Sequence, residues 1–431
     1  MNKVSPLLAE MFKRENVEEA IQHCVDKGMN KGELRNLKNS DKLLELYFDI
    51  VQGNKTFKPS HQAAIPKGDG TDRIVYVGDT CERFLCSLIN NALFKTCGKL
   101  IHPANKAYTK GLGTGSSVQE FSKKWADNYG KYYVVKGDFH HYFDDISKEK
   151  VYWLIDKIEK HLGFEQGTEP VCNLMRQMYD NDFLFDTEMN LIEKWSGIRQ
   201  GNAIASFIAN AMLYELDDYM TKKYPYYVRY SDDSITLCEN PDEVKADMNR
   251  IIAQYGITMN EKKFEIVTDS FIKFLGFNVN GNQITLSASR TKDLVNEIYN
   301  GIKNCHSATQ AINKINKILY KGNGEYSWGT SCLPIINVKR DISTLNSFFM
   351  DCIRIASINS NKKRKIKMKE IGGIGIEMNH SDYTMIRGKG SRVGTAISRT
   401  DKNIDGYLSL NCMIKNINTS RALYNTLVMS M

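Results

Sequence analysis

The sequence predicts an α+β fold in which an antiparallel sheet packs on helices, and two observations lead to it. First, residues 226–230 and 234–237 are rich in aromatic and β-branched side chains, and the Ser-Asp-Asp between them suits a turn. This pattern is typical of a β-hairpin. Second, long stretches on both sides repeat apolar residues at helical spacing. With 431 residues and 42% hydrophobic content, the chain can build two or three units with real cores.

The first 130 residues are expected to hold helices and one hairpin. Helical periodicity covers residues 7–25, 34–51 and 82–97, and residues 65–77 have the pattern of two strands joined by a Gly-containing turn. The glycine-rich stretch 111–117 lacks the Lys-Ser/Thr pair of a phosphate-binding loop. We therefore expect it to cap a helix over the residues that follow.

Residues 131–286 supply the predicted sheet and the helices packed on it. An apolar strand over 132–139 carries Asp138 near its end. The predicted helices of this region cover residues 148–161, 203–222 and 242–255. Further along the chain, helical stretches are predicted at 294–302, 308–320 and 345–358.

Three carboxylates, Asp138, Asp232 and Asp233, are the candidate catalytic residues. Phosphoryl transfer to a hydroxyl uses two hard cations about 3.5–4 Å apart, and carboxylates from neighbouring strands are suited to hold them. We therefore expect these acids to bind two Mg²⁺ ions, with Mn²⁺ as an alternative, in a nucleotide polymerase. An isolated Asp pair is most often a solvated turn. The motifs around this pair favour the metal site.

Between about Gln62 and about Val279 the chain resembles the reverse transcriptases, with several sequence blocks in that family's order. Residues 65–75 are similar to the family's fingers hairpin, and the resemblance implies that Lys67 and Arg73 hold the incoming triphosphate. The chemistry agrees, because a guanidinium grips phosphate oxygens as a fork and a lysine adds a point charge. The alternative is an ordinary basic turn.

The segment 137–146 is similar to the family's first palm motif. There the leading aspartate, here Asp138, binds metal, and an aromatic residue five positions later lies beneath the sugar. That aromatic is Phe143. Its ring would collide with a ribose 2′-hydroxyl, so deoxynucleotides are the expected substrates, while a plain core aromatic is the alternative.

The segment 197–210 looks like the next motif, a turn that leads into a helix of small residues. The resemblance implies that Gln200 and Gly201 position the templating base pair. Many relatives have proline where this sequence has Phe207, which puts the subfamily in doubt. The alternative is a tightly packed core helix.

Residues 255–267 are similar to the motif that follows the Asp pair, in which a lysine near the departing pyrophosphate donates a proton. Spacing favours Lys263 over Lys262 for this role. Phe264 replaces the usual small polar residue, so a solvated lysine pair is the alternative. Residues 274–279 match the strand pair that grips the primer in the family.

The resemblance implies a right-hand polymerase with RNA-directed DNA polymerase activity. We predict N-terminal helices and fingers at 1–130, a palm with interleaved fingers segments at 131–286, a helical thumb at 287–360 and a basic C-terminal extension at 361–431. No nuclease signature or ribonuclease H acid set is visible. What remains resembles the bacterial defence-associated and unknown-group reverse transcriptases, relatives of the retron and group II intron enzymes.

The charge favours a polyanionic partner, since the net charge is +8 and the pI about 8.8. Residues 362–369 hold six cations, and glycines alternate with cations at 387–392. Both are either nucleic-acid contacts or solvated basic loops. The expected partners are an RNA template, DNA product and deoxynucleoside triphosphates. We hypothesise a dedicated noncoding RNA as template and a part in antiviral defence.

The 10 cysteines are scattered without metal-ligand spacing, which suits a reducing cytosol. The start of the sequence lacks a signal-peptide pattern and no stretch is long enough to span a bilayer, so a cytoplasmic protein without membrane contact is expected. Two rivals stay open: an RNA-directed RNA polymerase, which usually has Gly before its Asp pair, and a noncatalytic, maturase-like RNA-binding scaffold. The primer and the oligomeric state cannot be read from the sequence.

Overall fold

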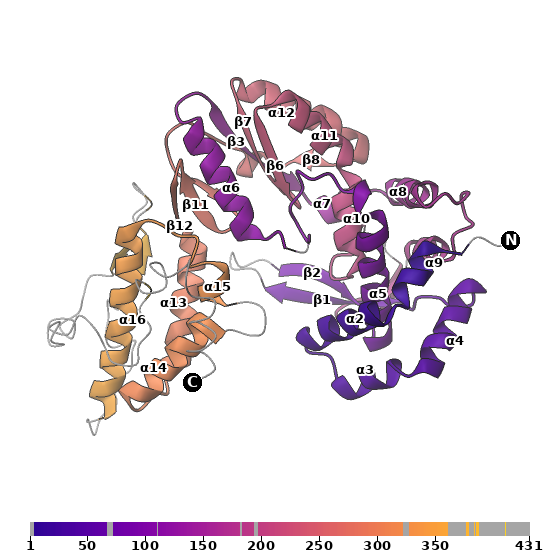
Figure 1. The fold of residues 1–431 in the computed structure, drawn as a ribbon, viewed down its shortest axis with the longest axis horizontal. Coiled ribbons are helices and arrows are strands. Elements are labelled where there is room, and N and C mark those ends of the chain that lie inside the picture. Colours follow the sequence, from indigo (N-terminus) through magenta and orange to yellow (C-terminus); the bar gives the residue numbers. More distant parts are fainter. Residues whose placement is uncertain are drawn as a thin grey trace. The chain divides into compact units, whose positions relative to one another are not determined.

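A computed structural model describes residues 4–66, 72–109, 111–181, 183–193, 197–321, 327–360, 376–378, 383, 385–387 and 410. The chain forms two compact units (Figure 1). Unit 1 comprises Met1–Gly113 and Tyr133–Ile266, and unit 2 comprises Thr114–Tyr132 and Val267–Met431. No helix in the described ranges combines the length and the apolar character that crossing a membrane requires.

Five helices begin unit 1: α1 (Pro6–Met11), α2 (Arg14–Asp26), α3 (Lys31–Leu37), α4 (Ser40–Val51) and α5 (Thr80–Cys97). Each of the two helical stretches predicted before residue 60 is divided in two. The second division has a local cause, since the side chain of Asn39 accepts a hydrogen bond from the Asp41 amide at 2.9 Å and starts α4 as a separate helix. The first division, at Lys13, has no such side-chain cap.

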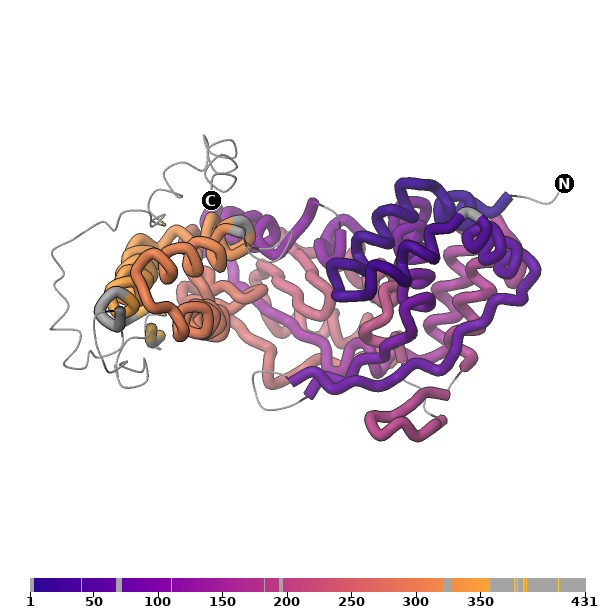
Figure 2. Tube along the Cα trace, turned by 90° about the horizontal axis from the view of Figure 1, so that it is seen from below, coloured from indigo at the N-terminus to yellow at the C-terminus, as the bar shows by residue number. Residues whose placement is uncertain are grey.

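The predicted hairpin at residues 65–77 is confirmed as β1 (Ser60–Pro66) and β2 (Asp72–Val77), which pair antiparallel with Ile65 opposite Arg73. Two short strands, β4 (Phe183–Phe185) and β5 (Leu191–Glu193), extend this sheet in the order β2-β1-β4-β5. The β4–β5 hairpin projects from the body of the unit (Figure 2). Lys67 lies outside the described residues.

The central sheet of unit 1 has the order β6-β7-β3-β8, and β9 also pairs with β3. Its strands are β3 (Tyr133–His140), β6 (Tyr226–Tyr230), β7 (Asp233–Cys238), β8 (Thr258–Met259) and β9 (Glu265–Val267). The six central residues of β3 are buried, because helices cover the sheet. The antiparallel pairs β3·β7, β6·β7 and β3·β8 confirm the predicted α+β fold.

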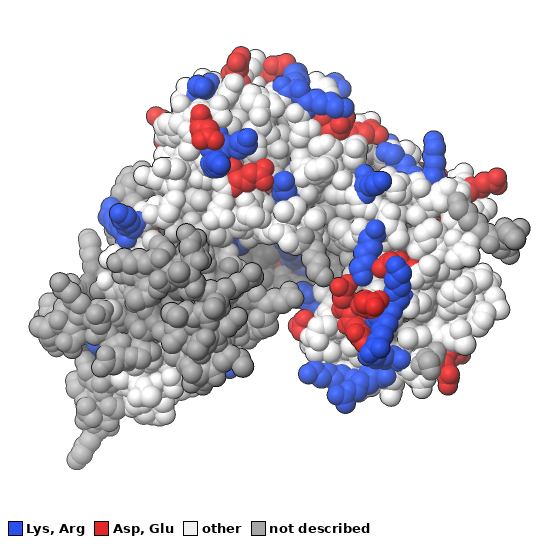
Figure 3. All heavy atoms as spheres, viewed as in Figure 1, with Lys and Arg blue, Asp and Glu red and all other residues white. Residues whose placement is uncertain are grey.

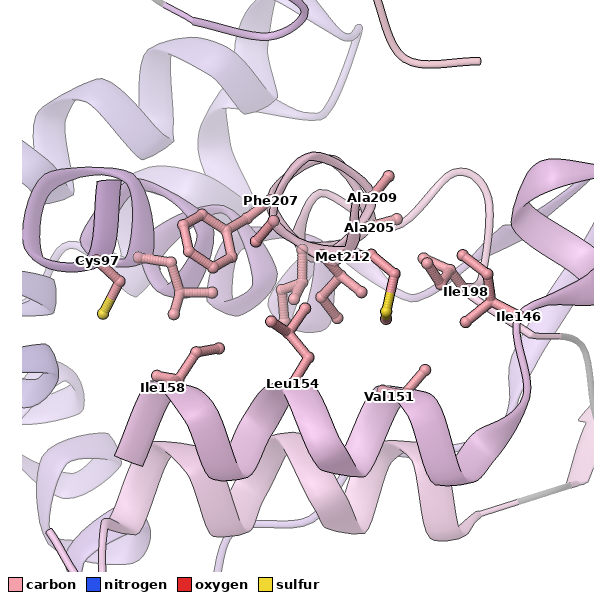
Figure 4. Packing of buried hydrophobic residues seen from close by; sticks show 14 of the residues in the cluster. Cys97, Ile146, Val151, Leu154, Ile158, Ile198, Ala205, Phe207, Ala209 and Met212 are labelled. Atoms are coloured by element: carbon pink, nitrogen blue, oxygen red, sulfur yellow. The ribbon is translucent and has the colours of Figure 1, made fainter. Parts of the chain in front are cut away.

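The helices of this region are α7 (Tyr142–Asp145), α8 (Lys148–His161), α9 (Pro170–Asp180), α10 (Ile204–Met212), α11 (Tyr214–Lys223) and α12 (Pro241–Ile252). The single helix predicted over 203–222 is interrupted at Leu213. Facing apolar side chains from α8 and α10 build the core shown in Figure 4. They are Val151, Leu154 and Ile158 from α8, and Ala205, Phe207 and Met212 from α10.

Unit 2 contains a small sheet and a set of helices. Its elements are α6 (Thr114–Asp127), β10 (Ile272–Phe274), β11 (Phe277–Asn280), β12 (Gln283–Leu286), α13 (Ala288–Ile302), α14 (Ala308–Asn316), α15 (Trp328–Ser331), α16 (Lys339–Ser360), β13 (Ile376–Met378) and β14 (Met385–Arg387). α6 packs on the sheet, where the Ser122 hydroxyl donates to the Gly281 carbonyl at 2.7 Å. Helices α13, α14 and α16 lie within residues 287–360, where helices were predicted.

Charged side chains of both signs mix on the face of the molecule seen in Figure 3. Ion pairs between surface residues include that of Lys95 with Glu19, at 3.1 Å. The two basic runs that dominate the sequence, residues 362–369 and 388–392, lie outside the described residues.

Candidate active site

The three predicted carboxylates meet at one end of the central sheet. Asp138 in β3 stands directly opposite Asp233, the first residue of β7. Asp232 precedes it in the turn that joins β6 to β7, and Ser231 enters this turn with a left-handed backbone, φ 61°. A non-glycine residue in this conformation marks a strained turn. The predicted hairpin is therefore present, and it places Asp232 and Asp233 close to Asp138.

The environment of these acids disfavours three free negative charges. Asp138 is 3% exposed. Burial raises the pKa of Asp232, and the charge of Asp138 raises it further. Burial and the charge of Asp232 raise the pKa of Asp233 to about 6. Carboxylates that repel one another in this way are the hard oxygen ligands that Mg²⁺ prefers, so the residues present fit a divalent cation.

Lys263 and Asn260 hold Asp138. The ammonium of Lys263 lies 2.9 Å from Oδ2 of Asp138, and the side-chain amide of Asn260 donates to Oδ1 at 3.1 Å. The Asn260 backbone N–H also donates to the Asp138 carbonyl at 2.8 Å. The three acids lie at the same end of the sheet without converging on one point, since no group of three His, Cys, Asp or Glu side chains in the described ranges is placed to hold a metal ion as it stands. Lys263 supplies a positive charge beside Asp138.

Asn260 belongs to the same sequence block as Lys263, yet sequence reasoning assigned it no role. The feature that could have identified Asn260 is its position immediately before the single 3₁₀ turn Glu261–Lys263, of which it is the N-cap residue. A polar side chain at the start of such a turn is free to bond across to a neighbouring strand. Here the neighbouring strand is the one that carries Asp138.

A cavity of about 640 Å³ is lined by three of the predicted substrate residues, Phe143, Gln200 and Gly201. Arg73, Lys263 and the three acids are not among its lining residues. The Gln200–Gly201 turn is tied to the β1–β2 hairpin, because the Tyr76 amide donates to the Gln200 carbonyl at 2.7 Å. Gly201 has φ 101°, and a Cβ there would lie 3.0 Å from Val75. Only glycine allows this close approach without strain.

Arg73 lies within electrostatic reach of the acids, since its positive charge opposes the upward shift in the pKa of Asp232. It stands on β2, opposite Ile65. Of the two cations predicted to grip phosphate, the structure therefore places only Arg73 within electrostatic reach of Asp232, and Lys67 lies outside the described residues.

Tyr108 lines the same cavity and was missed by sequence reasoning. Its backbone is left-handed, φ 56°. Burial raises the pKa of its hydroxyl, which lies close enough to Ser231 and Asp232 for both to affect that pKa. No sequence pattern predicts this position of Tyr108, because it depends on the path of the chain between α5 and α6.

Residues 65–279 match the family model described as reverse transcriptase (RNA-dependent DNA polymerase). This region is a reverse transcriptase domain. It contains the nine residues singled out in the sequence: Lys67, Arg73, Asp138, Phe143, Gln200, Gly201, Asp232, Asp233 and Lys263. Within it lie the central sheet and part of the β1–β2 hairpin.

A curated relative of this reverse transcriptase domain is the putative COX1/OXI3 intron 1 protein of Saccharomyces cerevisiae, which is 23% identical over 320 residues. The match covers 62% of this chain and 37% of that protein, so the chain spans little more than a third of its relative.

Two solved structures are similar to the chain. The apo telomerase of Candida tropicalis has a TM-score of 0.44 and 14% identity, covering 70% of this chain and 57% of that one. The RNA-dependent RNA polymerase of a human picobirnavirus has a TM-score of 0.38 and 15% identity, covering 52% of this chain and 43% of that one.

Proposed function

We propose that this chain is an RNA-directed DNA polymerase that extends a primer with deoxynucleotides. One observation carries the proposal: a reverse transcriptase domain brings Asp138 opposite Asp233 and next to Asp232, in surroundings that favour a bound cation. A domain of the family in which these acids were scattered or replaced would not support catalysis.

In this proposal Asp138 and Asp232 hold Mg²⁺ and Asp233 supports them. When bound, two such ions supply activation of the attacking hydroxyl and stabilisation of the leaving pyrophosphate. Arg73 and Lys67 bind the phosphates of the incoming nucleotide, and Lys263 donates a proton to the departing group.

The cavity residues of the reverse transcriptase domain select the substrate in this proposal. Phe143 screens the sugar, and Gln200 and Gly201 position the base pair. Support comes from their placement, because all three line one cavity of about 640 Å³ together with Tyr108. A cavity of this volume is within the range of small-ligand sites.

The finer parts of the proposal rest on the sequence alone, through its resemblance to a family, its basic segments and its scattered cysteines. They are a dedicated noncoding RNA as template, a role in antiviral defence, membership of the bacterial defence-associated subgroup, and a cytoplasmic location. The reaction is a property of the site, whereas its biological use is not fixed by fold or site chemistry.

A second candidate is a noncatalytic RNA-binding scaffold. The observation that favours it is the curated relative, whose name describes an intron protein. A scaffold would bind RNA without needing the three acids. The presence of all three at one end of the central sheet, with Asp138 opposite Asp233, favours the polymerase.

The test is to purify the protein from a host that carries its native flanking DNA and to sequence the RNA and DNA that copurify. The same is done with Asp232 and Asp233 both changed to Ala, and with Glu45→Ala, an exposed residue of α4, as the control. DNA complementary to one discrete RNA, lost only in the double variant, supports the polymerase and identifies its template. RNA without DNA in every preparation would instead indicate the scaffold.

A further inference from the structure

Arg229 and Asp217 form an ion pair that is wholly buried, with both side chains 0% exposed. The contact is bidentate: Nε of Arg229 donates to Oδ1 of Asp217 and Nη2 donates to Oδ2, each at 2.7 Å. The Tyr227 hydroxyl also donates to Asp217, at 3.0 Å. The pair joins β6 of the reverse transcriptase domain to α11.

The remaining nitrogen of Arg229 reaches the acid turn. Nη1 donates to the carbonyl of Ser231 at 2.9 Å, and Nη2 also donates to the carbonyl of Asn210 at 3.1 Å. Ser231 is the left-handed residue immediately before Asp232. One guanidinium therefore fixes the strained residue of the turn relative to the ends of α10 and α11.

The backbone of Arg229 holds the opposite side of the site. Its N–H donates to the Ala104 carbonyl, and its carbonyl accepts from the Lys106 N–H, both at 2.9 Å. The Asn210 side chain adds a bond to the Ala107 carbonyl at 2.6 Å. The next residue is Tyr108, which lines the cavity. The acid turn and Tyr108 thus depend on the same few contacts.

A buried ion pair is a poor device for stability alone. Removing two charges from water costs several kcal/mol for each ion, and well-packed apolar residues often replace such pairs without loss. The bond from Arg229 to Ser231 is what an apolar replacement could not supply. A lysine could keep the charge but could not bond Asp217, Ser231 and Asn210 together, because it lacks the planar fork.

We propose that Arg229, held by Asp217, is a positioning residue that fixes the Ser231–Asp232–Asp233 turn in the geometry that binds the catalytic cation. The proposal rests on the proposed function, since it assigns the turn a metal. It gives the pair a role in catalysis through Asp232, without contact to substrate.

The test compares Arg229→Lys and Asp217→Asn with Arg176→Lys, in the full chain. Arg176 is a matched control because it also pairs with two acids, the partly buried Asp156 at 2.6 Å and the buried Glu159, but its described contacts do not include the acid turn. Three quantities are measured: hydrogen exchange of the peptide 226–238, Mn²⁺ binding by electron paramagnetic resonance, and kcat and KM for dTTP on poly(rA) primed with oligo(dT).

We expect Arg229→Lys to exchange faster at residues 231–233, to bind Mn²⁺ more weakly and to lose about 10²-fold in kcat, the cost of a misplaced catalytic group. KM for dTTP should change much less. Asp217→Asn should follow in the same direction, and Arg176→Lys should change none of the three beyond a general loss of thermal stability. If Arg229→Lys does not fold, Asp217→Asn decides.

The proposal is overturned if exchange and Mn²⁺ binding in Arg229→Lys and Asp217→Asn match the wild type, or if Arg176→Lys produces the same losses. Suppose that the wild type binds Mn²⁺ but makes no DNA, and that Asp232→Asn does not bind Mn²⁺. This result would reject the proposed function alone. In that case exchange and Mn²⁺ binding still decide the role of Arg229. Absence of any Asp232-dependent Mn²⁺ binding would reject both.

Discussion

Lys263 and Asp138 form an ion pair, with 2.9 Å between the ammonium and Oδ2 of the carboxylate. The two partners differ in access to solvent: the Asp138 side chain is 4% exposed and that of Lys263 is 56% exposed. Burial lowers the pKa of Lys263, but the hydrogen bond and charge of Asp138 outweigh it and raise that pKa above its usual value. The lysine is therefore charged at neutral pH and competes with any cation for Asp138.

This competition predicts opposite effects of Lys263→Ala on binding and on catalysis. Because a partly exposed ion pair contributes up to about 1 kcal/mol, its removal should tighten Mn²⁺ binding by up to about fivefold. The same variant should polymerise more slowly, since the proposed proton donor is lost. Lys262→Ala, at the exposed neighbouring position, is the control. Weaker Mn²⁺ binding in Lys263→Ala would contradict the competition.

Asp233 should make the stability of the metal-free protein depend on pH. Burial raises its pKa from 3.8 to about 6. Between these values the folded protein keeps a proton that the unfolded chain releases, so this residue's contribution to the free energy of unfolding falls as pH rises through that window.

The measurement is urea unfolding of wild type and Asp233→Asn between about pH 4 and pH 7, since the window runs from the unfolded to the folded pKa. The wild type should lose stability relative to the variant as pH rises. Added Mg²⁺ should restore the stability of the wild type above pH 6. Below pH 6 its effect should be smaller, because the Asp233 carboxyl group is protonated. Parallel curves for the two proteins would show that Asp233 titrates normally.

Local sequence pattern was sufficient to predict the acid hairpin. Alternation of apolar and β-branched residues across 226–237 reports strands directly, and the observed β6 and β7 fall where expected. Asp138 was proposed as the partner of this hairpin because an apolar strand carries it near its end, and the resemblance to a family supported the choice. The register of the two segments could not be predicted, because strand register between distant segments leaves no mark in a single sequence. The structure supplied it as the pairing of Asp138 with Asp233.

The contacts that hold the site were beyond sequence reasoning for the same reason. Arg229 reads as an ordinary residue in a strand and Asp217 as one acid among several in a helix. Their pairing across 12 positions depends on how α11 packs beside β6. Tyr108 is a similar case, since its left-handed backbone follows from the anchoring of residues 104–107. The prediction of helix ends was wrong where a single capping residue, such as Asn39, interrupted a continuous apolar pattern.

Gly201 should tolerate no side chain. Its φ of 101° and the 3.0–3.1 Å approach of Val75 and Tyr76 predict that Gly201→Ala loses about 1–3 kcal/mol in the free energy of unfolding. Because the strain falls on the turn beside the cavity, KM for the nucleotide should also rise. Gly53→Ala separates the two effects, since Gly53 has φ 75° with nothing within 4 Å of an added Cβ. Equal KM values in the two variants would show that the contact with β2 is irrelevant to substrate.

Phe143 decides between deoxynucleotides and ribonucleotides if its ring screens the sugar. It lines the cavity, yet it also packs on Tyr142, with 5.4 Å between ring centroids, so it serves the core as well. Phe143→Ala should raise the ratio of kcat/KM for ribonucleotide to that for deoxynucleotide by about 10–10²-fold, the usual reach of steric discrimination in a pocket. Phe143→Tyr keeps the ring and should leave the ratio near that of the wild type.

The ratio is the right readout for Phe143 because it is measured within one preparation. Removing a core aromatic also destabilises the protein, and the resulting loss of folded enzyme lowers both kcat/KM values by the same factor. An unchanged ratio in Phe143→Ala would assign the residue to the core alone. A wild type that prefers ribonucleotides would instead favour an RNA-directed RNA polymerase, because a ring beneath the sugar has no reason to accept the 2′-hydroxyl.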